Sequence, residues 1–165
     1  MSAPELHRPI NPDRIGPSGL NITVDASPEE CAALAERMHL PAIHSLHCEF
    51  RLTDEGRGHF AARGHLRARI TQTCVITLEE FDTEIDEAFQ IRFVPAGEET
   101  AVIDPEDDDD LPYEGNSIDL GEAAAEQLAL TLDPYPRSPG AELPTEAQDD
   151  APNPFAALAA LRKLN

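Results

Sequence analysis

Residues 59–70 read His-Phe-Ala-Ala-Arg-Gly-His-Leu-Arg-Ala-Arg-Ile, and small or apolar residues alternate in this stretch with basic ones. In an extended chain successive side chains point to opposite faces, so the alternation predicts a strand with one buried and one exposed face. The exposed face carries the chain's main concentration of basic residues. Its candidate contact residues are Arg63, His65, Arg67 and Arg69.

Two alternating runs flank this strand and predict that it lies inside an antiparallel sheet. The run before it, residues 42–52, places Ala42, His44, Leu46, Cys48, Phe50 and Leu52 on one predicted face. Turn-forming residues 53–58 connect the two runs. The run after it, residues 81–93, alternates in the same way, with apolar side chains inward and mostly charged ones outward.

The charges on the outward faces suggest a register for the second hairpin. Antiparallel pairing of Ile70 with Phe81 would place Arg69, Arg67 and His65 opposite Asp82, Glu84 and Asp86, respectively. The same register sets Glu87 beside Gly64, where the missing side chain leaves room for a carboxylate stem.

Two helices are marked by capping residues. Ser27-Pro28-Glu29-Glu30 supplies an N-cap, a proline in the first turn and a glutamate three residues after the cap, ahead of an amphipathic run that ends before Pro41. Asp119-Leu120-Gly121-Glu122 begins a second helix, in which leucine or alanine recurs every four residues up to Leu132. Residues 20–24 alternate as a short strand would.

These elements predict an α+β fold: an antiparallel, curled or barrel-like sheet with two packed helices and a flexible acidic C-terminal part. Residues 1–19, rich in proline and glycine, are expected to be an extended lead-in. A single domain is expected over 20–137, with a mobile acidic loop at 95–117. The tail, 138–165, is expected to end in a short amphipathic helix that Asn153 caps, docked either on its own domain or on a partner.

The charge of the chain is strongly negative and unevenly distributed. The 165 residues carry a formal net charge of −20, which disfavours nucleic-acid binding unless a local basic face overcomes it. Residues 1–95 hold 15 acidic and 9 basic residues, whereas 96–165 hold 17 and 3. The sequence contains neither a secretory signal pattern nor a membrane-length apolar run, so we expect a cytoplasmic protein.

Patterns that carry catalysis or bind metal are weak. No nucleophile elbow or phosphate-binding loop occurs, so neither a hydrolase nor an NTPase is expected. His44, His47 and Cys48 are residue types that bind zinc, but strand geometry separates His47 from the other two. The three cysteines suit neither a disulfide framework nor a CxxC site, and they are interpreted as reduced thiols. No catalytic residue, metal or cofactor is therefore expected.

The basic stripe on residues 63–69 has two interpretations. It can track a phosphate backbone despite the net charge. Alternatively, its arginines are already paired with acidic residues across the hairpin, and this second interpretation is favoured because the charges complement each other in the predicted register.

Several segments in series resemble the YceD family, the bacterial large ribosomal RNA subunit accumulation proteins. They are Gln72–Glu79, Ile118–Gly121, Glu126–Leu130, Pro134–Arg137 and Asn153–Leu158. The matching residues that we single out are Cys74, Asp119, Gly121, Gln127, Pro136, Asn153, Pro154 and Phe155. The helix that begins at Ser27 and the acidic composition resemble the alphaproteobacterial branch.

The resemblance implies a role in accumulation or processing of 23S ribosomal RNA and no enzymatic activity. Many members carry a CxxC near the position of Cys74, but here Cys74 is followed by Val75, Ile76 and Thr77, which argues against such a metal site. The expected partners are large-subunit ribosomal proteins or a 23S rRNA precursor, with neither a membrane nor a small-molecule substrate. A negative chain favours the basic protein partner.

Two alternatives stay open from the sequence. One is a protein-interaction adaptor, unrelated to RNA, that uses its acidic surface and C-terminal helix. The other is a metal-dependent nucleic-acid enzyme that uses the carboxylates of residues 104–110.

Overall fold

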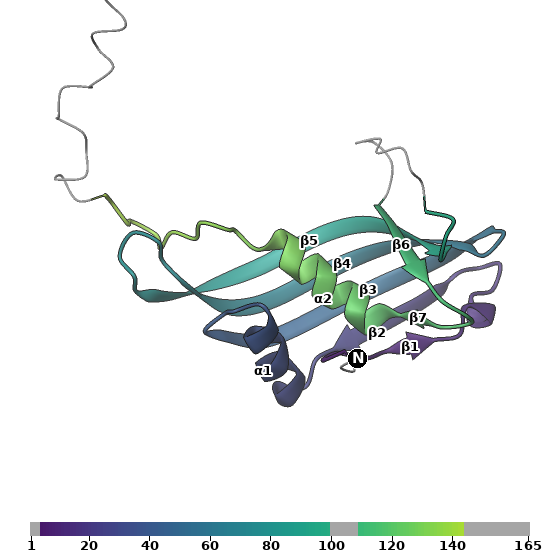
Figure 1. The fold of residues 1–165 in the computed structure, drawn as a ribbon, viewed down its shortest axis with the longest axis horizontal. Coiled ribbons are helices and arrows are strands. Elements are labelled where there is room, and N and C mark those ends of the chain that lie inside the picture. Colours follow the sequence, from purple (N-terminus) through teal and green to yellow (C-terminus); the bar gives the residue numbers. More distant parts are fainter. Residues whose placement is uncertain (1–3, 100–108, 144–165) are drawn as a thin grey trace, which may run out of the picture.

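The computed structural model describes residues 4–99 and 109–143, and its central element is a five-stranded sheet (Figure 1). The strands follow the order β2, β3, β4, β5, β6, and β6 alone runs parallel to its neighbour. Their bounds are Leu20–Asp25, Ala42–Gly56, His59–Thr73, Glu80–Pro95 and Asp109–Tyr113. A second small sheet pairs β1 (Pro9–Ile10) with β7 (Ile118–Asp119).

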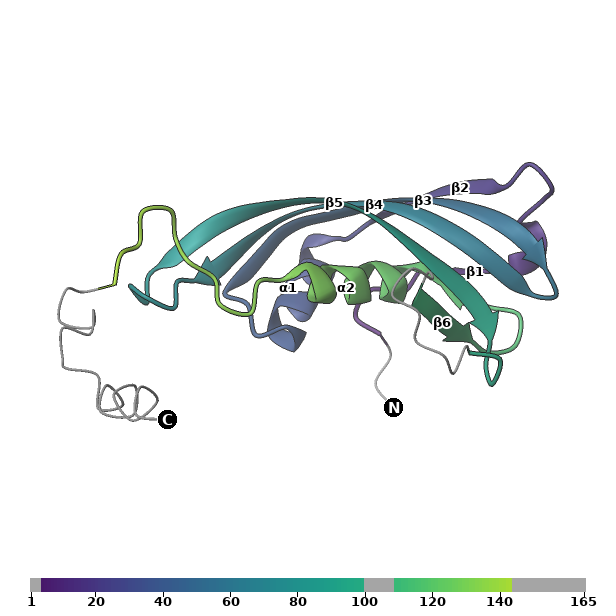
Figure 2. The ribbon, with the colours of Figure 1, turned by 90° about the horizontal axis from the view of Figure 1, so that it is seen from above.

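Two α-helices lie on one side of the sheet. Figure 2 shows the sheet curling over α1 (Pro28–Arg37) and α2 (Leu120–Thr131), which occupy its concave side. Buried side chains from both helices and from the strands form one apolar core, and a short 3₁₀ turn, η1 (Pro12–Arg14), precedes β2. The α+β prediction is confirmed. The barrel-like alternative is wrong, because β2 and β6 are opposite edges that do not pair.

Both predicted helix starts are confirmed, but the glutamate three residues after the cap has different partners in the two helices. The side chain of Ser27 accepts a bond from the Glu30 backbone, and the Glu30 carboxylate accepts one from the Ser27 N–H in return. Asp119 caps α2 by accepting from the N–H groups of Gly121 and Glu122. The Glu122 carboxylate, however, pairs with Arg37 on α1 and so links the two helices.

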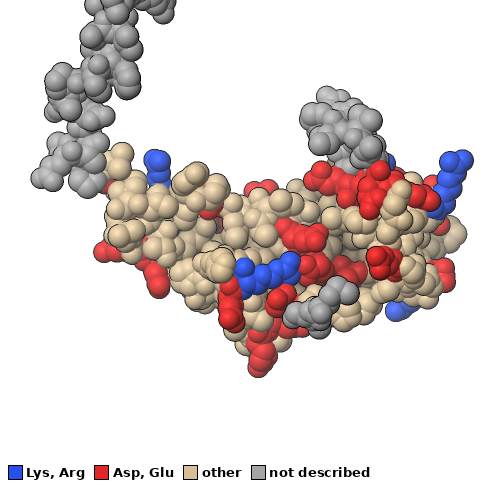
Figure 3. All heavy atoms as spheres, viewed as in Figure 1, with Lys and Arg blue, Asp and Glu red and all other residues tan. Residues whose placement is uncertain are grey.

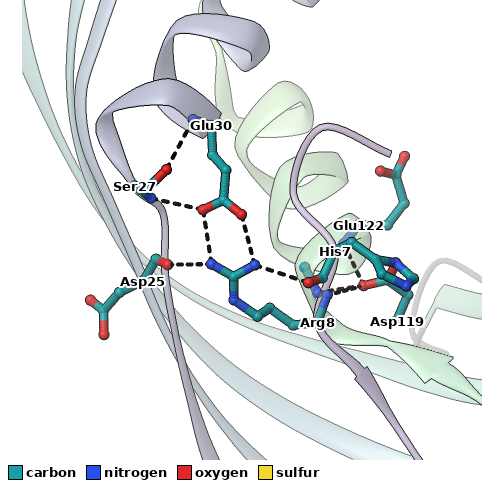
Figure 4. Close-up of polar contacts among 8 residues, drawn as sticks. His7, Arg8, Asp25, Ser27, Glu30, Asp119 and Glu122 are labelled. Atoms are coloured by element: carbon teal, nitrogen blue, oxygen red, sulfur yellow. Dashed lines mark hydrogen bonds and ion pairs between the residues drawn. The ribbon is translucent and has the colours of Figure 1, made fainter. Parts of the chain in front are cut away.

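The N-terminal segment is part of the core, although its prolines and glycines predicted an extended lead-in without regular elements. Leu6 and Ile10 are buried, and β1 forms there. The Arg8 guanidinium bonds both carboxylate oxygens of Glu30, at 2.7 and 2.8 Å, while the Arg8 N–H donates to Asp119 at 2.8 Å (Figure 4). One residue thus ties the N-terminal segment to the first turns of both helices.

The register of the β4–β5 hairpin differs from the predicted one by two residues. Ile70 lies opposite Thr83 instead of Phe81, so Arg69 faces Glu84 and Arg67 faces Asp86. Because the shift is one of two residues, the same side chains still point outward. Its cause lies at Gly64, which is opposite Phe89: a Cβ at Gly64 would lie 2.0 Å from the Phe89 ring, so the aromatic side chain occupies the space that the glycine leaves.

Three further expectations are corrected or left open by the structure. A register shift between Ile43 and Ser45 in β3 leaves Ile43 buried and His44 exposed, so His44 does not share the face of Cys48. The expected acidic loop contains β6, which pairs with β5 although its residues show no alternation. The predicted terminal helix, with Asn153, Pro154 and Phe155, lies outside the described residues.

Candidate functional site

The side of the sheet opposite the helices, here called the convex face, carries the predicted basic stripe. The strand registers arrange its outward side chains in rows that run across β2, β3, β4 and β5. The first row is Asn21, Arg51, Arg63 and Gln90; the second is Thr23, Glu49, His65 and Ala88; the third is Asp25, His47, Arg67 and Asp86. A shorter fourth row contains Ser45, Arg69 and Glu84.

Most of the predicted stripe is neutralised by acidic neighbours. Arg69 pairs with Asp82 at 2.8 Å, and His65 pairs with Asp86 at 2.5 Å. These are the partners that the sequence suggested, although they now lie diagonally across the strands. Arg67 instead pairs with Glu49 on β3, at 3.1 Å. The second interpretation of the stripe therefore describes these three residues well.

The ion pairs shift the titration of groups on the convex face. Hydrogen bonds with Asp25 and then Glu49 raise the pKa of His47 above its ordinary value. Hydrogen bonds from Arg69 and then Thr71 lower the pKa of Asp82. Both directions favour the charged forms, so each shift reflects stabilisation by the hydrogen-bonded partners.

The first row differs from the others because, among the described residues, its arginines bond only neutral groups. Arg51 bonds the side chain of Asn21 and the backbone oxygen of Ser18, and Arg63 bonds Gln90. Sequence reasoning singled out Arg63 but missed Arg51, because it paired the basic strand only with the strand that follows it.

The helix-bearing face carries an excess of negative charge. Figure 3 shows many acidic side chains and few basic ones on it. Its described carboxylates come from several elements, among them Glu29, Glu36, Glu114, Glu122 and Glu126. Arg37 already pairs with both Glu5 and Glu122, at 3.0 and 2.7 Å.

A cleft of about 340 Å³ opens on this face between β6 and the first half of α2. Its apolar lining includes Phe93, Leu111 and Ala123. Its carboxylates are Glu114, Asp119, Glu122 and Glu126, and no lysine or arginine that the structure describes lines it. We call this site the acidic cleft.

The carboxylates of the acidic cleft are not equivalent. Asp119 is occupied as the cap of α2 and by His7 and Arg8, and Glu122 is occupied by Arg37. Among the described residues, Glu126 forms no hydrogen bond or ion pair. Burial, and then the charge of Glu122, raise the pKa of Glu126. A carboxylate in this position gains most from a cation supplied by another molecule.

The geometry of the acidic cleft suits a lysine or arginine side chain. Such a side chain can lay its aliphatic stem on apolar groups while its charged head reaches the carboxylates at the rim. Metal binding receives no comparable support, because the described residues contain no group of three or more His, Cys, Asp or Glu side chains placed to hold an ion.

The family-motif residues that the structure describes are packed against, or hydrogen-bonded to, other parts of the chain. Gly121 packs against the backbone of Leu6, Gln127 is buried, and the carbonyl of Pro136 accepts a bond from the N–H of Val75. Cys74 is fully buried. Burial by itself raises the pKa of its thiol, but hydrogen bonds from Ser138 and Thr77 together outweigh burial and lower the pKa to about 6.

Sequence reasoning missed the acidic cleft except for Asp119. The wall that β6 provides comes from a segment whose composition resembles a loop, and no periodicity reveals that it runs parallel to β5. The acidic excess after residue 95 was the available signal, but it gave no geometry.

Comparison with models of protein families gives a match to this chain. A family model described as Large ribosomal RNA subunit accumulation protein YceD matches residues 62–162. No curated protein and no solved structure matches the chain significantly. Among the described residues, no helix is long and apolar enough to span a membrane.

Proposed function

The chain belongs to the YceD family of large ribosomal RNA subunit accumulation proteins, and from this premise we propose that it is a non-enzymatic assembly factor of the large ribosomal subunit. It acts in the cytoplasm and supports the accumulation of 23S rRNA by holding a basic ribosomal protein during assembly. The acidic cleft is the contact site for that protein.

The observation that carries this proposal is the arrangement of charge around an apolar floor in the acidic cleft. Ribosomal proteins are rich in lysine and arginine, and complementary charge speeds their association with an acidic partner. Burial and the charge of Glu122 raise the pKa of Glu126, and the charge of Arg37 opposes them without outweighing them. A bound lysine or arginine would add a cation beside Glu126 and would exclude water from Leu111, which is half-buried.

The test compares two variants that change the charge equally. Glu114→Gln with Glu126→Gln removes two carboxylates from the acidic cleft. Glu36→Gln with Glu84→Gln removes one from α1 and one from the convex face, both outside the cleft. Each variant and the wild type are immobilised and exposed to acid-extracted proteins of purified large subunits, and the captured proteins are identified by mass spectrometry.

We expect the cleft variant to capture basic ribosomal proteins at least about threefold less well than the wild type, with the control variant unchanged. Equal losses in both variants would show a general effect of charge and remove the cleft from consideration. A wild-type protein that captures none of these proteins would refute the protein-contact mechanism.

The assembly role is tested separately in cells that lack the protein, by the ratio of mature 23S to 16S rRNA. A reduced ratio is expected. An unchanged ratio, combined with specific capture of some other basic protein, would favour the adaptor that is unrelated to RNA.

A further inference from the structure

Arg51 and Arg63 form a pair of like charges in the middle of the sheet. They are directly opposite each other in the antiparallel β3–β4 ladder, and both side chains stand on the convex face. Residues in such positions have Cβ atoms about 5 Å apart, where like charges repel each other and destabilise the sheet. Each of the other stripe residues has a carboxylate partner, and this pair has none among residues 4–99 and 109–143.

The hydrogen bonds of the two guanidinium groups confirm this difference. Arg51 donates to Asn21 Oδ1 at 3.1 Å and to the Ser18 carbonyl at 3.3 Å, and Arg63 donates to Gln90 Oε1 at 3.1 Å. All three acceptors are neutral. A guanidinium has five N–H donors, so both groups keep donors available for a ligand.

A neighbouring carboxylate on the convex face, that of Glu49, is bonded to other partners. Glu49 lies two residues from Arg51 on the same strand, but its Oε1 atom bonds Arg67 at 3.1 Å and His47 at 3.3 Å. The two arginines and Glu49 line a shallow hollow of about 420 Å³, together with Asn21, Thr23 and His65. The arginine end of this hollow therefore offers several donors and a local positive charge.

We propose that Arg51 and Arg63 form a phosphate-binding site that a backbone phosphate of RNA occupies. Arginine forks match the geometry of phosphate oxygens, and an anion between the two guanidinium groups would relieve their repulsion. The choice of RNA over a free anion rests on the proposed function. Both side chains are also exposed on an open surface of the sheet, and a single strand of RNA can lie across such a surface.

The net charge of the molecule limits the strength of this contact without preventing it. Charges beyond a Debye length, about 8 Å at physiological ionic strength, are largely screened, so a phosphate at the pair responds mainly to its immediate neighbours. The long-range repulsion from the acidic helix face still slows approach. We therefore expect weak binding by the isolated protein, which falls further as salt is added.

The experiment follows the arginine Nε–Hε signals of the full-length protein by NMR during two titrations. One uses a 12-nucleotide single-stranded RNA, and the other uses inorganic phosphate at constant ionic strength. We expect both to shift the signals of Arg51 and Arg63, and RNA to do so at a concentration at least about tenfold lower, because it contacts further groups on the face.

Two variants with equal changes in charge make the test specific. Arg51→Gln with Arg63→Gln should weaken RNA binding at least about tenfold. Arg67→Gln with Arg69→Gln should change it less than about threefold, because those arginines already have carboxylate partners. Circular dichroism checks that both variants are folded, as expected for four exposed positions.

Other outcomes would overturn the proposal in different ways. Equal weakening by both variants would mean that RNA responds only to overall charge. Shifts with phosphate and none with RNA would assign the site to a small anion. No shift at Arg51 or Arg63 with either probe would refute the site itself. Because the cleft variants test protein capture independently, a failure here leaves the proposed function standing.

Discussion

The two faces of the sheet compensate their charges to different degrees. On the convex face, Arg67 and Arg69 each have a carboxylate partner, whereas Arg51 and Arg63 have none in the part of the chain that the structure describes. On the helix-bearing face, carboxylates exceed their basic partners, and several converge on the acidic cleft. The net charge of −20 is a sum over the whole chain and locates neither uncompensated region.

The physical reason lies in how the side chains are positioned. In a sheet, the register brings residues of neighbouring strands together, so complementary charges can be matched pair by pair. The helix-bearing face is assembled from separate elements, and acids accumulate there partly for local reasons. Glu29, Glu30 and Glu122 lie in first turns of helices, where the helix dipole favours negative charge.

The largest expected effect comes from a substitution that disrupts the packing of the helix-bearing face and leaves the convex face unchanged. A Cβ at Gly121 would lie 2.5 Å from the backbone oxygen of Leu6 and 2.9 Å from the backbone nitrogen of Arg8. Backbone atoms cannot rotate away, so Gly121→Ala should reduce the free energy of unfolding by about 1–3 kcal/mol, measured in urea. Gly16→Ala, where a Cβ meets nothing within 4 Å, is the control. Equal midpoints for the two variants would contradict the close packing.

A smaller effect separates the charge of the acidic cleft from its packing. Burial raises the pKa of Glu126 above its ordinary value of 4.5, so its ionised form opposes folding at neutral pH. Glu126→Gln should therefore raise the Tm by about 2 °C at pH 7.5, a modest change because the carboxyl is partly exposed.

The sign of this effect sets its pH dependence. The protonated Glu126 contributes stability that is complete below pH 4.5 and is lost as the pH rises through the folded-state pKa. The Tm difference between variant and wild type should therefore shrink toward pH 4. A difference that is constant across this range would point to packing instead of charge.

The parts of this fold with strong local signals could be predicted from the sequence. Ser27 and Asp119 identify both helix starts, and alternation identifies the outward residues of β4 and β5 correctly. The exact register could not be predicted in the same way. A shift of two residues keeps the same faces, and it was decided by packing of Phe89 over Gly64, which charge complementarity does not reveal.

The candidate sites depend on contacts between strands that local sequence patterns do not predict. Arg51 meets Arg63 through a hairpin that has an irregularity between Asp54 and Gly56, so counting back from the turn gives the wrong partner. The acidic cleft needs β6, a strand that forms because β5 offers an open edge to a distant segment. In both cases a pairing between strands creates the site, and the residues alone give only its charge.

The smallest expected effect sharpens the comparison by testing whether the paired arginines of the convex face contribute to stability at all. Arg69 donates a hydrogen bond to Asp82 and lowers the pKa of that carboxyl. The pair therefore stabilises the fold at any pH above the ordinary pKa of Asp82. This stabilisation is lost as the pH falls through the pKa that Asp82 has in the folded protein. Both side chains are about half exposed, at 55% and 48%, where water and salt weaken ion pairs. Arg69→Gln should accordingly lower the Tm by less than about 1 °C at pH 7 and have no effect in 1 M salt. A larger loss that persists in high salt would mean that the convex face depends on its ion pairs as much as the helix-bearing face depends on packing.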